Sequence, residues 1–233
     1  MEAERKKLTP GRLVLTAIYI LIFPALILIL SGDWHWVEGW IFDIWFTALC
    51  ATTIIYLYRQ DPALLAERYR QPGAASQRSW DRYVVYGLGL GFVLWTVIMP
   101  LDAKRFGWSP DFPLWLKIIG GILLIPSSFL FFRSYADNTF VSPLVRIQSE
   151  RRQRVVSTGV YGFVRHPMYL GGILLFTGVP ILLGSMYGLI IGVLMSCLLV
   201  ARIIGEERML VKELDGYADY RKKVKYRLIP FIW

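Results

Sequence analysis

Residues 167–201 read PMYLGGILLFTGVPILLGSMYGLIIGVLMSCLLVA, 35 consecutive positions without Asp, Glu, Lys or Arg. One straight helix over this stretch would be about 50 Å long, far more than the roughly 30 Å hydrocarbon core of a bilayer requires. Gly184 and Ser185, near its middle, are typical turn residues. We therefore predict a tight helical hairpin that turns at these two residues. A single long tilted helix is the alternative.

Four other apolar stretches precede the hairpin, at residues 13–32, 37–58, 83–101 and 112–132. Each is close to the length of about 20 residues that a transmembrane helix requires. Together with the hairpin they predict an all-α integral membrane protein with about six transmembrane helical passes. We divide the chain into residues 1–135, which hold four spans, and residues 136–233, which hold the hairpin, the loop before it and the C-terminal segment after it.

The overall composition supports a lipid environment. Of the 233 residues, 55% are hydrophobic and only 18% are charged, whereas soluble domains carry about a quarter charged residues. The net charge is +9, but the basic residues lie in clusters between apolar stretches and form no basic-aromatic recognition motif. We therefore expect the bilayer, and not nucleic acid, to be the partner of this chain.

The basic clusters also predict which side of the membrane each loop occupies. Of the 26 Lys and Arg residues, 23 fall at residues 5–12, 59–82, 133–165 and 202–227, which six passes would place on one side. Loops rich in Lys and Arg remain on the cytoplasmic side of a membrane. We therefore expect both termini to be cytoplasmic. We expect a bacterial or archaeal inner membrane in preference to the endoplasmic reticulum.

The two cysteines, Cys50 and Cys197, both lie inside apolar stretches. Neither has the spacing of a zinc-ligand set, and a disulfide between them is not expected. We predict no metal site.

The start of the hairpin is a candidate binding site. Pro167 disfavours helical geometry at His166 but suits the first position of a helix, so the helix should begin at the proline. Its first backbone N–H groups would then be free and would face the basic side, which favours a carboxylate or another anion. In the alternative interpretation, Arg165 and His166 only anchor the chain to lipid headgroups.

Arg202 and Glu206 form the second candidate element. They are four residues apart and share one face of a helix, so the simplest interpretation is an exposed ion pair of small energetic value. The hairpin, however, returns this face close to Arg165 and His166. Charged residues at the edge of a membrane span often mark a functional site. We therefore predict that Arg202 and Glu206 are catalytic residues.

Several linked motifs resemble one known family. Gly159-Val-Tyr-Gly-Phe-Val-Arg-His-Pro-Met-Tyr169, Arg202-x-x-x-Glu206-Glu207, Gly216-Tyr-x-x-Tyr220 and the closing Ile-Pro-Phe-Ile232 occur in this order. They closely resemble the isoprenylcysteine carboxyl methyltransferase family, which is related to the phospholipid N-methyltransferases. The resemblance covers about the last hundred residues, and the first four spans resemble no family that we can name.

The resemblance implies a methyltransferase that uses S-adenosyl-L-methionine and that binds it in a cytoplasmic pocket built from loops and the C-terminal tail. Arg202 matches the residue at the acceptor side of that pocket. The cofactor would be held by residues that match Gln148, Gln153, Arg154, Val155, Val156, Tyr161, His166, Pro167, Met168, Tyr169, Glu206 and Glu207. Gln153 departs from the family, in which histidine is usual at this position.

The implied acceptor is a lipophilic molecule in the membrane. The presence of Arg202 favours a carboxylate such as that of an isoprenylcysteine, because an arginine can bind a carboxylate with two hydrogen bonds. A small thiol or a phospholipid headgroup, methylated on sulfur or nitrogen, is the alternative acceptor. A non-catalytic membrane scaffold or a transporter is the alternative of another class, although no span has a charged midpoint.

Overall fold

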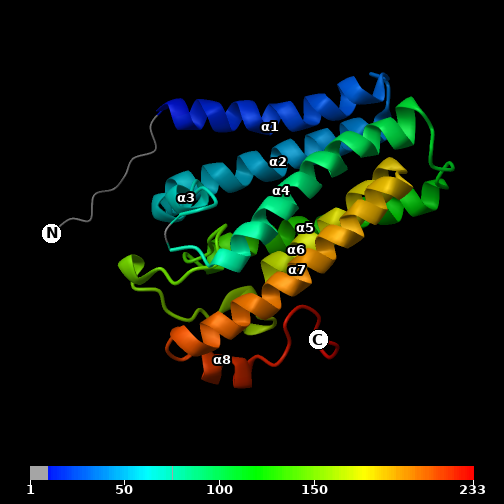
Figure 1. Cartoon of the computed structure of the whole chain (residues 1–233). Coiled ribbons are helices and arrows are strands. Elements are labelled where there is room, and N and C mark those ends of the chain that lie inside the picture. The colour runs from blue at the N-terminus through cyan, green and yellow to red at the C-terminus, as the bar shows by residue number, and fades with distance from the viewer. Residues whose placement is uncertain (1–9, 75) are drawn as a thin grey trace.

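Six long helices extend between the two ends of the molecule in the computed structural model, which describes residues 10–74 and 76–233 (Figure 1). They are α1 (Pro10–Ser31), α2 (Val37–Gln60), α4 (Ser79–Pro100), α5 (Leu114–Asp137), α6 (Pro167–Leu183) and α7 (Met186–Glu213). α4 continues directly into a π-helical turn, Leu101–Arg105. The described part of the chain contains no β-strand.

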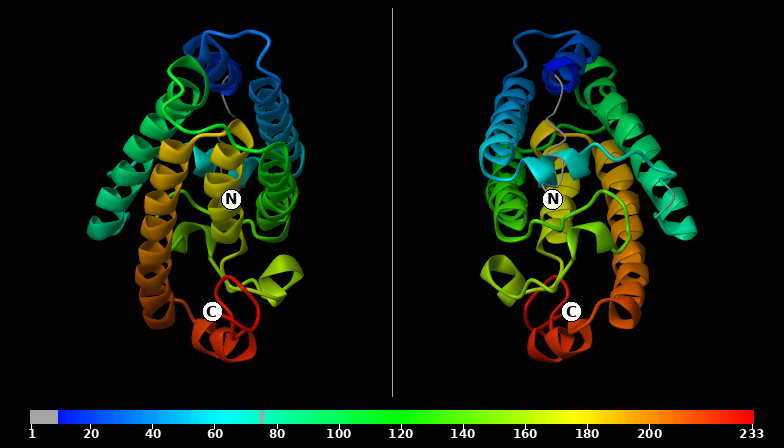
Figure 2. Two further views of the ribbon diagram at one scale, coloured as in Figure 1. Left: turned by 90° about the vertical axis from the view of Figure 1, so that its right-hand side faces the viewer. Right: turned by 90° about the vertical axis from the view of Figure 1, so that its left-hand side faces the viewer.

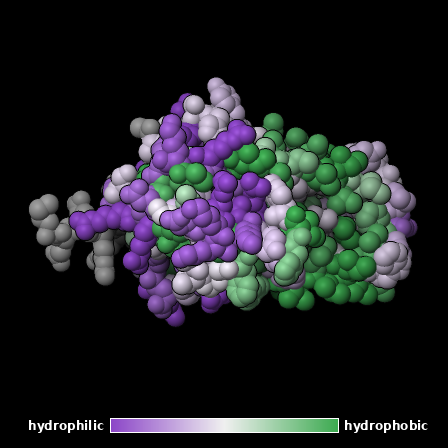
Figure 3. All heavy atoms as spheres, turned by 90° about the horizontal axis from the view of Figure 1, so that it is seen from below, coloured by the Kyte–Doolittle hydropathy of each residue, from purple (hydrophilic) through white to green (hydrophobic). Residues whose placement is uncertain are grey.

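The remaining elements are short and lie at one end of the bundle. They are α3 (Pro62–Arg68), two 3₁₀ turns (Ser149–Arg151 and Gly159–Gly162) and α8 (Tyr217–Lys223). We call this the loop end, and we call the opposite end, where α6 meets α7, the turn end (Figures 1 and 2). Figure 3 shows a mostly hydrophilic surface at the loop end and a mostly hydrophobic surface between the loop end and the turn end.

The predicted hairpin is present. Gly184 ends α6 in the left-handed conformation with φ of 82°, and Ser185 begins α7 by accepting a hydrogen bond from the backbone N–H of Gly188. Glycine is favoured at a left-handed position after a helix, because the Cβ atom of any other residue crowds the backbone there. The turn therefore excludes the single long helix over residues 167–201.

The predicted spans agree with the helices, but their ends differ. α5 continues to Asp137, five residues beyond the apolar stretch, and α7 continues through charged residues to Glu213. Four helices, α2, α4 with its π turn, α5 and α7, are long and apolar enough to cross a membrane. α6 and the apolar part of α1 are shorter, so the number of passes stays a prediction. Arg5, Lys6 and Lys7 of the predicted cytoplasmic cluster lie outside the described residues.

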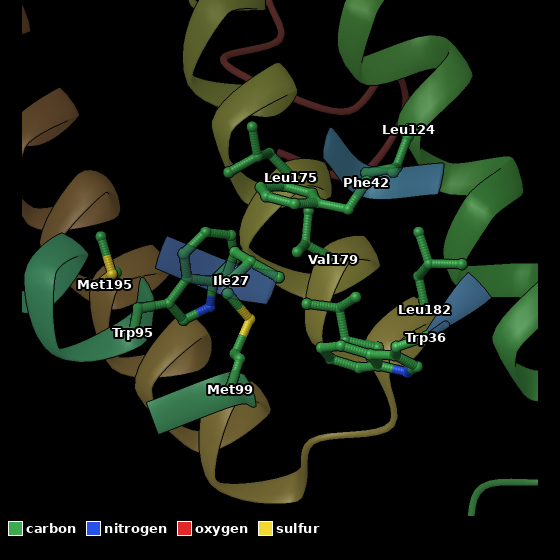
Figure 4. Packing of buried hydrophobic residues seen from close by; sticks show 11 residues of the cluster. Ile27, Trp36, Phe42, Trp95, Met99, Leu124, Leu175, Val179, Leu182 and Met195 are labelled. Atoms are coloured by element: carbon green, nitrogen blue, oxygen red, sulfur yellow. The ribbon is translucent and has the colours of Figure 1, made fainter. Parts of the chain in front are cut away.

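The core of the bundle joins all six long helices. Its buried side chains include Ile27, Phe42, Trp95, Met99, Leu124, Leu175, Val179 and Met195 (Figure 4). Two close helix contacts depend on glycine. An added Cβ at Gly120 in α5 would lie 2.4 Å from the backbone nitrogen of Leu182, and one at Gly192 in α7 would lie 2.1 Å from the carbonyl oxygen of Phe176. Small residues let membrane helices approach to backbone contact in this way.

Replacing Gly120 with alanine should therefore separate α5 from α6. We expect a loss of about 1–3 kcal/mol of unfolding free energy, the range for a side chain forced into a filled contact. The measurement is denaturant unfolding in detergent micelles. Gly89→Ala in α4 is the matched control, since no atom lies within 4 Å of an added Cβ there. Equal stability of the two variants would show that the close contact at Gly120 is not required.

Candidate functional site

A cavity of about 330 Å³ lies at the loop end, between the loop that follows α5, the start of α6 and the last turns of α7. Of the predicted site residues, Gln153, Arg154, Val155, Val156, Tyr161, His166, Pro167, Met168, Tyr169, Arg202 and Glu206 line it. Its apolar part includes Phe131, Gly172, Phe176 and Leu199. Residues far apart in sequence thus meet where the hydrophobic surface gives way to the hydrophilic loop end.

The start of α6 forms one wall, as the sequence predicts. The helix begins at Pro167, with His166 in a non-helical conformation before it. The backbone N–H groups of Arg165 and His166 donate to the carbonyl oxygens of Tyr226 and Arg227, at 3.0 and 2.9 Å. The backbone of the C-terminal tail is therefore hydrogen-bonded to the two residues that precede α6.

Glu207 lies outside the cavity and joins three basic side chains. Its carboxylate accepts from Arg165 Nε at 2.6 Å, from His166 Nε2 at 3.2 Å and from Arg227 Nε at 2.8 Å. Arg165 also donates to the carbonyl oxygen of Val224. Arg165 and His166 are thus buried partners of Glu207, which is inconsistent with their interpretation as headgroup anchors. Glu207, predicted to bind the cofactor, is not part of the cavity lining, and it holds the tail against α6 and α7.

Arg202 and Glu206 do not pair with each other in the described structure, although they share a helix face. Arg202 Nε donates to Asp81 Oδ1 at 2.7 Å, and one terminal nitrogen of its guanidinium donates to the carbonyl oxygen of Pro143. Glu206 instead accepts a short hydrogen bond from the hydroxyl of Tyr169. The guanidinium lies 6.0 Å from the centre of the Tyr169 ring. The ion pair expected from spacing alone is therefore absent.

Asp81, which the sequence analysis missed, positions Arg202. It is completely buried at the start of α4, and its second carboxylate oxygen accepts from the side chain of Gln77 and the backbone N–H of Val145. It lies 121 positions before Arg202 in the chain. No local motif marks it, so only the fold could reveal the pair.

We expect Asp81→Asn to destabilise the protein by about 3 kcal/mol, because removing one partner of a buried ion pair leaves the other charge uncompensated. Denaturant unfolding in micelles measures this change. Asp219→Asn is the control, since Asp219 forms only an exposed pair with Lys222 and should leave stability unchanged. A stable Asp81→Asn protein would contradict a positioning role.

The loop after α5 is held by buried polar contacts. Gln148 is 1% exposed and lies outside the cavity lining, and its side chain bonds to the Phe140 carbonyl and to Arg151. Its backbone N–H donates to the side-chain oxygen of Gln153 at 2.8 Å. Gln148 thus shapes the loop, whereas Gln153 lines the cavity that this loop closes.

A buried ion pair fastens the same loop to α3. Arg146 donates to both carboxylate oxygens of Glu67 at 3.0 and 2.8 Å, and Ser142 adds a third hydrogen bond. Burial alone would raise the pKa of Glu67, but these hydrogen bonds and the charges of Arg146 and Arg70 hold it below its usual range. A lowered pKa means that the pair stabilises the fold above about pH 4.5. The stabilisation is lost as the pH falls through the lowered pKa.

Contacts with α5 and α8 hold the turn that contains Tyr161. Asp137, the last residue of α5, accepts from the backbone N–H of Val160, and an added Cβ at Gly159 would overlap its carboxylate at 2.0 Å. Gly159 has φ of 58°, so glycine meets both requirements of this turn. Tyr220 in α8 donates to the carbonyl oxygen of Tyr161 at 2.7 Å.

Three of the tyrosines that line the cavity have raised pKa values. Burial raises the pKa values of Tyr161, Tyr217 and Tyr220 above the usual phenol value. All three line the cavity. They therefore offer neutral hydroxyl groups and ring faces, and not a phenolate base. Tyr217 and Tyr220 belong to the Gly-Tyr-x-x-Tyr motif, but no role in the site was predicted for them from the sequence.

Comparisons with known proteins support the motif resemblance. Residues 115–215 match the model of the phospholipid methyltransferase family. Protein-S-isoprenylcysteine O-methyltransferase B of Arabidopsis thaliana is 27% identical over 131 residues, which are 55% of this chain and 63% of the plant protein. Protein-S-isoprenylcysteine O-methyltransferase of Schizosaccharomyces pombe is 34% identical over 85 residues, 36% of each chain. The chain thus spans less than two thirds of the length of either relative.

A solved structure shares the fold. The eukaryotic intramembrane Ras methyltransferase, an isoprenylcysteine carboxyl methyltransferase, aligns with 93% of this chain and 75% of its own length, with a TM-score of 0.55 and 22% identity. This match confirms the all-helical membrane architecture. Together with the sequence matches, it confirms the resemblance to the isoprenylcysteine carboxyl methyltransferase family.

Proposed function

We propose that this relative of the isoprenylcysteine carboxyl methyltransferases is an integral membrane methyltransferase that uses S-adenosyl-L-methionine to methylate a lipophilic acceptor. The observation that carries the proposal is the position of the cavity. Its polar wall includes Gln153, Asn138 and Glu206, while Phe176 and Leu199 form an apolar wall inside the helix bundle. Such a cavity suits a polar methyl donor on one side and a lipophilic acceptor on the other.

The cavity suits the proposed cofactor. Its volume of about 330 Å³ falls in the range of about 300–1,000 Å³ found for small-molecule sites. The N–H groups of Tyr169 and Leu170 bond to the His166 carbonyl oxygen, so the α6 dipole and not free N–H groups favours a carboxylate there. Glu206 favours an ammonium or a ribose hydroxyl, and aromatic rings favour a cationic sulfonium. We assign cofactor binding to Gln153–Val156, Tyr161, His166–Tyr169 and Glu206. When bound, S-adenosyl-L-methionine supplies a methyl group on a positively charged sulfur.

The residues of the cavity orient the reactants and exclude water. Methyl transfer depends chiefly on proximity and alignment, and a carboxylate acceptor needs no base to become nucleophilic. This agrees with the cavity, in which Tyr161, Tyr217 and Tyr220 stay neutral and His166, the only histidine among the described lining residues, is bonded to Glu207 through Nε2. One terminal guanidinium nitrogen of Arg202 has no hydrogen bond in the described structure. We propose that Arg202 binds the carboxylate of the acceptor through this nitrogen.

The membrane placement follows from the same proposal. The chain is a multi-pass membrane protein, and we propose that the loop end, with its clustered arginines, and both termini face the cytoplasm. A bacterial or archaeal inner membrane remains our preferred location.

We also propose that the chain divides at residue 135, although the match to the phospholipid methyltransferase family begins earlier, at residue 115 near the start of α5.

The test offers a prenylcysteine acid, its amide and phosphatidylethanolamine separately, with labelled cofactor, to protein in lipid nanodiscs. We expect label on the acid alone. Equal labelling of the acid and the amide would contradict the carboxylate assignment. Labelling of phosphatidylethanolamine instead would support nitrogen methylation, the function that the phospholipid methyltransferase match favours.

Arg202→Ala should impair acceptor use more than cofactor binding, and the reverse result would contradict its acceptor role.

A further inference from the structure

The segment after α8 exposes three apolar side chains that the proposed function does not use. Ile229, Phe231 and Ile232 are 44%, 88% and 77% exposed, and Phe163, just before the start of α6, is 74% exposed. Isolated apolar side chains on a surface are common, but a cluster of large ones usually marks a contact. We call Ile229–Ile232 the tail tip.

The tail tip is held in place by the fold. Behind it, Leu228 is buried, and the carbonyl oxygen of Trp233 accepts hydrogen bonds from the backbone N–H groups of Arg227 and Leu228. The chain therefore closes on itself and presents the tip outward. Phe231 has φ of 67°, a left-handed conformation that is uncommon for a bulky residue. Backbone strain of this kind persists only where the surrounding contacts impose it.

The position of the tail tip along the membrane follows from the length of α6. Its 17 residues span about 25 Å, less than the roughly 30 Å of a hydrocarbon core. With the turn end at one boundary, the start of α6 must lie at or inside the other. Arg165 and His166 there pair with Tyr226 and Arg227, so the tail lies at the same depth. Figures 1 and 2 show the C-terminal segment close to the loop-end portions of α6 and α7.

We propose that the tail tip and Phe163 insert into the lipid bilayer at the loop end, at the boundary between headgroups and acyl chains. The apolar tip follows the residues that bond to the start of α6, and aromatic side chains are typical of this boundary. Lys223 and Lys225, both exposed, precede the tail tip and suit lipid headgroups. The occupant of this surface is thus lipid.

This contact has a consequence for the cavity. The tail supplies the Val224 carbonyl to Arg165 and the Arg227 guanidinium to Glu207. Lipid that holds the tail tip therefore also holds the wall that positions the start of α6. The proposal does not depend on methyl transfer, because it concerns only where the tail lies.

The test places a polarity-sensitive nitrobenzoxadiazole fluorophore at Phe231→Cys in a chain with Cys50→Ala and Cys197→Ala. Labelled protein is reconstituted into phosphatidylcholine–phosphatidylglycerol vesicles. We expect lipids with a nitroxide near the top of the acyl chain to quench this label several-fold more than a label at Lys222→Cys. The side chain of Lys222 is 78% exposed on α8, which makes it the matched control.

Iodide present on both sides of the vesicles should give the opposite order, with the Lys222→Cys label quenched more strongly. Ile232→Cys provides a second position and should behave like Phe231→Cys. If both tail labels are quenched by iodide as strongly as the label at Lys222→Cys, and are insensitive to the lipid nitroxide, the tail lies in water and the proposal is wrong.

Discussion

Glu207→Gln should lower the unfolding free energy by about 3–5 kcal/mol, the cost of removing one partner from a buried ion pair. The carboxylate compensates the charges of Arg165 and Arg227 and also binds His166. Glutamine retains the shape of the side chain but leaves two guanidinium groups without a counter-charge. Denaturant unfolding in micelles gives the change in stability.

Hydrogen exchange should locate the damage. The backbone amides of Arg165 and His166 donate to the tail, so they should exchange much faster in Glu207→Gln, while those in the middle of α5 should change less. Glu213→Gln on the same helix is the control. Its pair with Arg78 is exposed, and its loss should cost less than about 1 kcal/mol. If the two variants lose the same stability, Glu207 does not hold the tail.

Glu206→Gln should weaken cofactor binding by about 10–100-fold, because a hydrogen bond to a charged group contributes about 1.5–3 kcal/mol. The fold should survive, since the side chain bonds only to the Tyr169 hydroxyl in the described structure. Calorimetric titration with S-adenosyl-L-methionine measures the change. Tyr169→Phe, which removes only that hydroxyl, should have a smaller effect. Unchanged affinity in Glu206→Gln would remove this residue from the cofactor site.

The different roles of these two glutamates show where prediction from sequence stops. Consecutive residues of a helix point about 100° apart, so Glu206 and Glu207 leave the helix in different directions. The motif groups them, and the resemblance assigned both to the cofactor. Only the packed position of α7 turns Glu206 to the cavity and Glu207 to Arg165.

The hairpin was predictable because it is a local feature. A 35-residue uncharged stretch is too long for one crossing, and Gly184 supplies the left-handed residue that a tight turn requires. The start of α6 at Pro167 follows in the same way from the geometry that proline imposes. Asp81 was not predictable, because its role depends on a contact across 121 positions that no periodicity reveals.

The central claim is that the loop-end cavity binds S-adenosyl-L-methionine, and isothermal titration of the purified protein in lipid nanodiscs tests it most directly. We predict saturable binding with one site per chain, weakened in Glu206→Gln and retained in Glu213→Gln. Absence of binding heat and of any thermal stabilisation by the cofactor, in protein whose unfolding transition is intact, would contradict the claim and favour a non-catalytic membrane protein.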